Sequence, residues 1–211
     1  MEKIDYQKVL DATLARVSRA TKKPALLLHA CCAPCSSYVI EYLQEYFDIT
    51  LYFYNPNIAP KEEYDFRADE LKRLVKEMPI ASGTKVIVEE YNSGEFYNIA
   101  KGREEMPEGG ERCKECYRLR LERTARRAGE DGFDFFCTTL SISPYKNAAR
   151  LNSIGGELGR EYGVEYLVSD FKKKNGYKRS CELSREYALY RQDWCGCEFS
   201  KAEAQKRKAL K

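Results

Sequence analysis

Short apolar runs alternate with helical patterns along most of this chain. The run ALLLHA at residues 25–30 is typical of a buried parallel strand. Similar runs predict four more strands, at residues 49–57, 84–90, 133–139 and 164–170. Helices are predicted around them, at residues 5–20, 36–47, 61–78, 94–101, 113–128, 147–162, 181–190 and in a basic C-terminal segment. Because strands that alternate with helices pair in parallel through right-handed crossovers, we predict an α/β fold with a parallel sheet flanked by helices.

Cysteines and polar turns fall at the carboxyl ends of the predicted strands. Four features share this position: Cys31, Cys32, the turn at residues 55–57 and the turn at residues 138–139. In parallel α/β sheets the active crevice lies beyond the carboxyl ends of the strands. We therefore expect a functional site at this edge of the sheet.

The length of 211 residues suits a single domain, residues 1–211. Within it we distinguish a helical extension at residues 1–22, a catalytic core at residues 23–200 and a basic tail at residues 201–211. The N-terminus has no apolar region of the kind that a secretory signal needs, and no stretch approaches about 18 uninterrupted apolar residues. We expect a cytoplasmic protein without a membrane partner. The net charge of +3 permits a nucleic-acid partner without demanding one.

Nine cysteines in such a chain need a chemical explanation. Structural disulfides are rare in the reducing cytosol, and an odd number of cysteines argues against a fully paired framework. Seven of them form three tight groups: Cys31, Cys32 and Cys35; Cys113 and Cys116; Cys195 and Cys197. This grouping indicates metal or redox chemistry. The isolated Cys137 and Cys181 are expected to be structural.

The first group lies between a predicted buried strand and the start of a predicted helix. Backbone N–H groups and the positive end of a helix favour thiolates there, as metal ligation requires. The order Cys32-Ala-Pro-Cys35 also has the form of a thioredoxin-like dithiol. A set of small buried hydrophobic residues is the third and weakest interpretation.

The other two groups differ in spacing. Cys113 and Cys116 open a predicted helix, so their sulfurs share one side of its first turn and suit two corners of a metal site, with zinc as the common alternative. Cys195 and Cys197 lie in the C-terminal segment YRQDWCGC. The glycine between them permits a tight backbone in which the two cysteines form a strained, redox-active disulfide. They can equally supply metal ligands.

Residues other than cysteine give weaker signals. For His29, a hydrogen-bonded histidine at the end of a strand is favoured over a catalytic role. Basic residues crowd three stretches near the cysteines, residues 112–127, 172–179 and 201–211, and a polyanion approaching the site would account for this. We interpret Tyr54, Tyr64, Tyr145 and Tyr177 as core and surface residues rather than as one stacking platform, but some of them could stack on a base if the substrate is RNA.

Six sequence segments occur together in the order found in one known family. They are LLLHACCAPCS, FYNPNI followed by PKEEY, ERCKECYRLRLERTA, FCTTLSISPYKN, YKRS and YRQDWCGCEFS. Through them the chain, from about residue 24 to 200, resembles the epoxyqueuosine reductases of the QueH type, formerly a family of unknown function. The resemblance implies a Rossmann-like sheet similar to that of the nucleotide alpha hydrolases. No G-x-G-x-x-G or P-loop pattern is present, so we infer no bound nucleotide.

The resemblance implies a specific reaction and a specific cofactor. Epoxyqueuosine at the tRNA wobble position is reduced to queuosine without cobalamin, in the last step of queuosine biosynthesis. The family binds a [4Fe-4S] cluster, with an additional iron nearby for which Cys35 is a candidate ligand. By motif matching, Cys195 and Cys197 are the redox-active pair, and the cluster ligands are Cys31, Cys32, Cys113 and Cys116.

The implied deoxygenation needs two electrons, two protons and an electron donor outside the chain. The sequence does not distinguish among three candidates for the proton donor: His29, Tyr145 and Lys146. The target base also has to leave its stack to reach a buried metal. Two other functions stay open: a thioredoxin-like dithiol oxidoreductase that uses Cys32 and Cys35 without iron, and a zinc-stabilised RNA-binding protein.

Overall fold

The structure is a computed structural model that describes residues 4–209. Within these residues, five parallel strands form one sheet of order β3-β2-β1-β4-β5. The elements in chain order are α1 (Tyr6–Val17), β1 (Ala25–His29), α2 (Ala33–Leu43), β2 (Asp48–Phe53), α3 (Lys61–Glu77), η1 (Pro79–Ala81), β3 (Lys85–Val88), α4 (Gly94–Ala100), α5 (Glu111–Glu130), β4 (Phe135–Thr138), η2 (Thr139–Ile142), α6 (Ala148–Tyr162), β5 (Glu165–Tyr166), α7 (Gly176–Glu186) and α8 (Glu198–Ala209).

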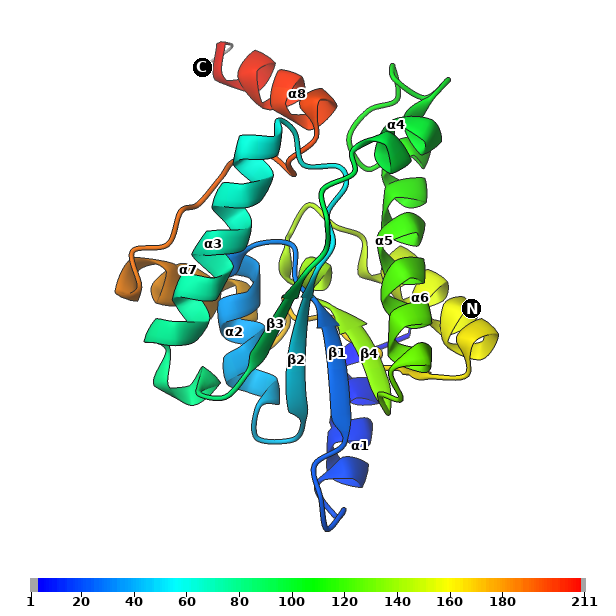
Figure 1. The fold of residues 1–211 in the computed structure, drawn as a ribbon, viewed down its shortest axis with the longest axis vertical. Helices are drawn as coiled ribbons and strands as arrows, with labels where there is room; N and C mark the ends of the chain where they lie inside the picture. Colours follow the sequence, from blue (N-terminus) through cyan, green and yellow to red (C-terminus); the bar gives the residue numbers. More distant parts are fainter. Residues whose placement is uncertain (1–3, 210–211) are drawn as a thin grey trace.

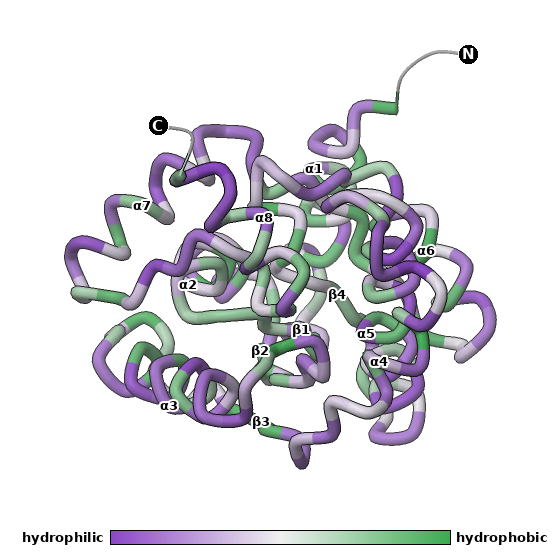
Figure 2. Tube along the Cα trace, turned by 90° about the horizontal axis from the view of Figure 1, so that it is seen from above, coloured by the Kyte–Doolittle hydropathy of each residue, from purple (hydrophilic) through white to green (hydrophobic). Residues whose placement is uncertain are grey.

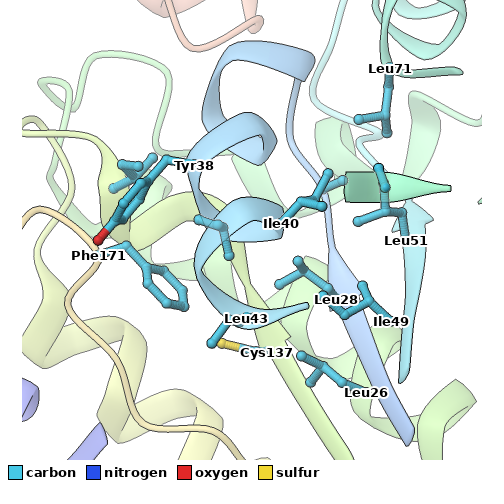
Figure 3. Packing of buried hydrophobic residues seen from close by; sticks show 14 of the residues in the cluster. Leu26, Leu28, Tyr38, Ile40, Leu43, Ile49, Leu51, Leu71, Cys137 and Phe171 are labelled. Atoms are coloured by element: carbon cyan, nitrogen blue, oxygen red, sulfur yellow. The ribbon is translucent and has the colours of Figure 1, made fainter. Parts of the chain in front are cut away.

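Helices cover both faces of the sheet. Helices α2, α3 and α7 lie on one face and α5 and α6 on the other (Figure 1), and the view from above separates them in the same way (Figure 2). Because side chains alternate along a strand, Leu26 and Leu28 of β1 pack toward α2, whereas Leu27 packs toward α5 and α6. Figure 3 shows the first of these clusters, in which Cys137 lies near Leu26 and Leu43. The predicted parallel α/β fold is confirmed.

The strand order places a topological switch between β1 and β4. From β1 the chain proceeds outward to β2 and β3, and it then returns to add β4 and β5 on the opposite side of β1. Parallel sheets bind ligands outside the carboxyl ends of the strands at such a switch. Cys31 follows β1 and Thr139 follows β4, and the Cys31 backbone N–H donates to Thr139 Oγ1 at 3.2 Å. The cysteine loop therefore lies at the switch point.

Helix α2 begins at Ala33, three residues before the predicted start at Ser36. Cys32 has an extended backbone and precedes the helix, and Pro34 occupies the first turn. Proline is well tolerated there because the first turn has no intrahelical partner for its missing N–H. As a consequence Cys35 belongs to the first turn of α2 rather than to a loop.

Two predictions near the C-terminus were wrong in extent. Helix α7 starts at Gly176, inside the predicted basic loop, because Asn175 adopts a left-handed conformation and the chain passes closely over Phe171. A Cβ at Gly176 would come within 2.1 Å of the Phe171 carbonyl oxygen. Strand β5 covers two residues of the predicted 164–170. Beyond β5 the backbone is bonded by a side chain instead of a neighbouring strand. The Asn152 amide nitrogen donates to the Ser169 carbonyl, and the Asn152 amide oxygen accepts from the Ser169 N–H, each at 3.0 Å.

The two ends of the described chain are helical. Helix α1 buries Leu10, Leu14 and Val17 in the core. Helix α8 begins just after Cys197 and continues into the predicted basic tail, whose last two residues, 210 and 211, lie outside the described residues. Among residues 4–209, every helix is too short or too polar to cross a membrane.

Candidate metal and redox site

The first cysteine group converges at the end of β1. The sulfur atoms of Cys31, Cys32 and Cys35 all lie within 4.8 Å of one another, and the Cys31 and Cys32 sulfurs are 3.8 Å apart. Cys32 is buried, with 2% of its surface exposed, and the other two are half-buried. The sharp turn from β1 into α2 brings the side chains of adjacent residues to the same point. Three thiol sulfurs this close together can hold a metal ion.

Hydrogen bonds divide the protons unequally among these three thiols. Donation from Cys31 and Cys35, together with the positive charge of Arg67, lowers the pKa of Cys32 well below its usual value. The same hydrogen bond to Cys32 raises the pKa of Cys31 to about 11, and bonds to both neighbours raise the pKa of Cys35. Cys32 therefore gives up its proton more readily than Cys31 and Cys35.

The second and third groups share a small cavity. Cys113 and Cys116 lie in the first turn and a half of α5, and they line this cavity together with Cys195 and Cys197. Burial raises the pKa of Cys116 to about 12 and also raises the pKa of Cys113 and of Cys197. The Gly109 backbone N–H donates to the Cys113 sulfur at 3.2 Å. Four thiols thus surround a space of about 10 Å³.

The tight backbone predicted at Gly196 is present. Its φ is +119°, and a Cβ there would come within 2.8 Å of Ile58. The Gly196 carbonyl accepts from the Ala59 N–H at 3.1 Å, and the Ser200 N–H donates to the Cys197 sulfur at 3.4 Å. All nine cysteines lie within the described residues and are free thiols. The disulfide between Cys195 and Cys197 stays a prediction for an oxidised form.

A larger cavity of about 140 Å³ connects the groups. Its lining includes all three sulfurs of the first group and also Cys195, which borders the small cavity as well. Cys195 is thus the thiol common to both spaces. The structure gathers the first group with Cys195, and Cys113 and Cys116 with Cys195 and Cys197.

Known proteins resemble this chain over most of its length. A sequence model of the family described as "Epoxyqueuosine reductase QueH" matches residues 26–203. The chain belongs to this family. Proteins named "Epoxyqueuosine reductase QueH" include one from Streptococcus pyogenes that is 43% identical over 94% of this chain and 79% of its own length. The corresponding protein from Staphylococcus epidermidis is 44% identical over 94% and 85%, and that from Thermotoga maritima is 35% identical over 87% and 94%.

Arg120 carries a buried positive charge beside the cysteines. Its side chain is 1% exposed, Nε donates to the Cys116 carbonyl at 3.2 Å, and Nη2 has no hydrogen-bond partner among residues 4–209. Burial lowers the pKa of Arg120, but the negative charges that Cys116, Cys195 and Cys31 can carry outweigh burial and raise it. A buried guanidinium needs an anionic partner, and deprotonated cysteines beside it would supply one.

Arg67 and Arg112 are also buried, and both organise segments that carry cysteines. Arg67 bonds Glu63 at 2.7 Å, stacks on Trp194 and donates to the Cys195 carbonyl at 3.4 Å. Arg112 donates to three backbone carbonyls of the loop that precedes α5. Arg112 and Arg120 belong to the basic stretch at residues 112–127, but both are 1% exposed and do not add to its solvent-facing charge. The spacing of Arg120 four residues after Cys116, on one face of α5, was the signal available in the sequence.

An iron–sulfur group fits the donor set of this family member. Soft thiolate ligands in groups of three and four are the ligands that iron–sulfur clusters use. Among residues 4–209, no side chain or backbone group bonds Nη2 of Arg120, so this nitrogen can donate to an additional negatively charged group. The thiol donors and the unpaired guanidinium nitrogen both favour an anionic, thiolate-ligated group at the switch point.

His29 is placed for structure rather than for catalysis. It is fully buried, with Nε2 3.0 Å from the Tyr54 carbonyl and Nδ1 2.9 Å from Thr138 Oγ1. Because a carbonyl only accepts, Nε2 carries the proton and Nδ1 accepts from the hydroxyl. The favoured interpretation of His29 as a hydrogen-bonded core residue agrees with this geometry.

We expect His29 to make stability depend on pH in the metal-free chain. Burial, followed by the charge of Arg120, lowers its pKa from 6.5 to about 4. Below pH 6.5 the unfolded chain binds a proton at His29, whereas the folded chain does not bind it until the pH reaches about 4. This difference stabilises the folded chain above pH 6.5. The free energy of unfolding therefore falls by about 3 kcal/mol as the pH is lowered from 6.5 toward 4. Urea unfolding at several pH values measures this loss. A His29→Gln variant with the same pH slope between 6.5 and 4 would show that His29 is not its source.

Proposed function

We propose that this protein reduces epoxyqueuosine to queuosine in tRNA, without cobalamin, by means of an iron–sulfur cluster held at the switch-point cysteines. One observation carries the proposal: seven cysteines from three distant segments line two adjoining cavities that share Cys195. We infer the substrate from the similar proteins, which are named as epoxyqueuosine reductases. Nine free thiols suit a reducing compartment, so we place the reaction in the cytoplasm.

The reaction removes one oxygen from a carbon framework. Both C–O bonds of the epoxide break, a C=C bond forms, and the oxygen leaves as water after gaining two protons. Two electrons are required, and oxidation of the Cys195 and Cys197 thiols to a disulfide releases two electrons and two protons, which balances the equation. An external reductant then returns the disulfide to two thiols.

We assign the cluster to Cys31, Cys32, Cys113 and Cys116, as the resemblance implies. Cys35, whose sulfur lies within 4.8 Å of the Cys31 and Cys32 sulfurs, is proposed as a ligand of an additional iron. When bound, the cluster supplies electrons one at a time. The buried positive charge of Arg120 favours retention of the thiolates that hold it.

The rim of the larger cavity suits a nucleoside. Tyr145 and Tyr177 line the cavity and are 74% and 39% exposed, so each offers a ring face to a base that has left its stack. The neighbouring Lys173 and Lys178 are exposed and available to phosphates. Tyr54 and Tyr64, in contrast, are buried.

One experiment separates this proposal from the dithiol and zinc alternatives. We expect protein purified without oxygen to contain iron and sulfide and, once reduced, to convert epoxyqueuosine tRNA to queuosine tRNA, as mass spectrometry of the digested tRNA would show. A colourless, iron-free protein that performs this conversion would overturn the iron–sulfur assignment. An iron-loaded protein that leaves the epoxide intact would overturn the substrate.

A further inference from the structure

Lys146 brings a nearly buried ammonium group to the larger cavity. It lies in the loop between η2 and α6, at the carboxyl end of β4, and it is 7% exposed. It lines the cavity together with the first cysteine group and Cys195. Its Nζ is 3.3 Å from Glu108 Oε1. Lys146 is the one lysine of a lining that also contains four cysteines and the arginines Arg67, Arg191 and Arg207.

Glu108 fixes the position of this lysine from two other parts of the chain. Glu108 belongs to the loop before α5, its backbone N–H donates to Glu203 of α8 at 2.9 Å, and its Oε2 is 3.7 Å from Arg207 of α8. The backbone N–H of Lys146 also donates to the Ser143 carbonyl at 3.1 Å. The ammonium is thus paired with Glu108, whose own position is fixed by contacts with α8.

The other two proton-donor candidates are less well placed. His29 does not line the cavity, and both of its ring nitrogens are already bonded to Thr138 and Tyr54. Tyr145 lines the cavity but is mostly exposed to solvent. Proton donation is most effective from a group held in a water-excluded site.

We propose that Lys146 binds the epoxide oxygen of the substrate, stabilises the negative charge that develops on it and donates one of its two protons. This inference rests on the proposed function. The two electrons come from the Cys195 and Cys197 dithiol, the second proton comes from a thiol of that pair, and the oxygen leaves as water. The other thiol proton restores the Lys146 ammonium, so the balance of two electrons and two protons is kept.

Electrostatics at the site keep the lysine protonated. Burial lowers the pKa of Lys146, but the negative charges available at Cys195, Tyr117 and Glu108 outweigh burial and raise it. The alkoxide that develops as the C–O bond opens is a strong base, and an ammonium in direct contact with it can pass a proton to it. A fixed positive charge at this point also lowers the energy of the charged transition state.

Binding measurements test this role without turnover. Epoxyqueuosine tRNA and queuosine tRNA differ by the one oxygen that Lys146 is proposed to contact. We expect wild-type protein to bind the epoxide form more tightly than queuosine tRNA. In Lys146→Met the ratio of these two affinities should fall roughly 10-fold, because a hydrogen bond from a charged group is removed. The affinity for queuosine tRNA should stay unchanged. Lys76→Met, which removes an exposed lysine in the last turn of α3 that lines neither cavity, is the matched control and should keep the preference.

Single-turnover kinetics test the same role in the reaction. We expect Lys146→Met to lower the rate roughly 10²–10³-fold while iron content and thermal stability match those of the wild type. Lys146→Arg keeps the charge and the pairing with Glu108, so it should fold and keep the epoxide preference, but lose about 10-fold or more in rate because a guanidinium gives up its proton reluctantly. An active wild type whose two variants match it in rate and preference would overturn the role of Lys146. A wild type that makes no queuosine would instead overturn the proposed function.

Discussion

Replacing Cys195 with serine is expected to stop queuosine formation while leaving most of the bound iron in place. Serine keeps the size of the side chain and the backbone bond from residue 195 to Ser200 Oγ, which is 3.1 Å long. It removes the one thiol that borders both cavities, and with it the dithiol that we propose as the source of two electrons. Loss of a residue that reacts directly commonly costs about 10⁴-fold or more in rate, so turnover should fall below detection.

The position of Cys195 makes this experiment informative in both directions. Three quantities are measured for each variant: queuosine formation by mass spectrometry, iron content, and the visible absorbance of the cluster. Cys181→Ser is the matched control, because Cys181 is a half-buried thiol on α7 that lines neither cavity. Absorbance that disappears with Cys195→Ser, but not with Cys181→Ser, would make Cys195 a ligand and contradict its assignment to the redox pair.

The sheet and its active edge were predictable because they depend on local patterns. Buried parallel strands are continuous apolar runs, and the switch-point rule then places the site at their carboxyl ends. The start of α2 was misplaced because proline usually marks a break, whereas Pro34 fits the first turn. The start of α7 depends on a close approach between Gly176 and Phe171, which no local pattern encodes.

The candidate cysteines were predictable, but their surroundings were not. Spacing alone separates the three groups, whereas the sharing of Cys195 between two cavities depends on where the loop before α8 lies against Arg67 of α3. In the sequence Arg120 looks like one surface residue of a basic stretch, and Lys146 is one of three candidate proton donors among which the sequence does not choose. Their burial depends on partners far away in sequence, such as Asn55 for Arg120 and Glu108 for Lys146. The sequence therefore identifies the candidate cysteines but not the buried charges that lie beside them.

Replacing Cys32 with serine is expected to have the largest effect on metal content. Cys32 is the most buried thiol of the first group, and hydrogen bonds from Cys31 and Cys35 make it the preferred thiolate. A serine hydroxyl stays neutral at pH 7 and is a poor ligand for iron, which selects soft thiolates here. We expect iron content to fall by about 10-fold and turnover to be lost with it. Metal analysis and visible absorbance of protein purified without oxygen would measure the first effect.

A matched control must show that the loss comes from ligation and not from a disturbed core. Cys137→Ser provides it, because Cys137 is fully buried on the neighbouring β4 and its sulfur donates to the Leu167 carbonyl at 3.2 Å, a bond that serine can also make. This variant should keep its iron, since Cys137 lines neither cavity. If Cys32→Ser retained full iron while Cys137→Ser lost it, the metal would have to lie elsewhere in the protein. If both lost it, core packing would be the cause, because the two residues share burial but only Cys32 shares the switch point with Cys31 and Cys35.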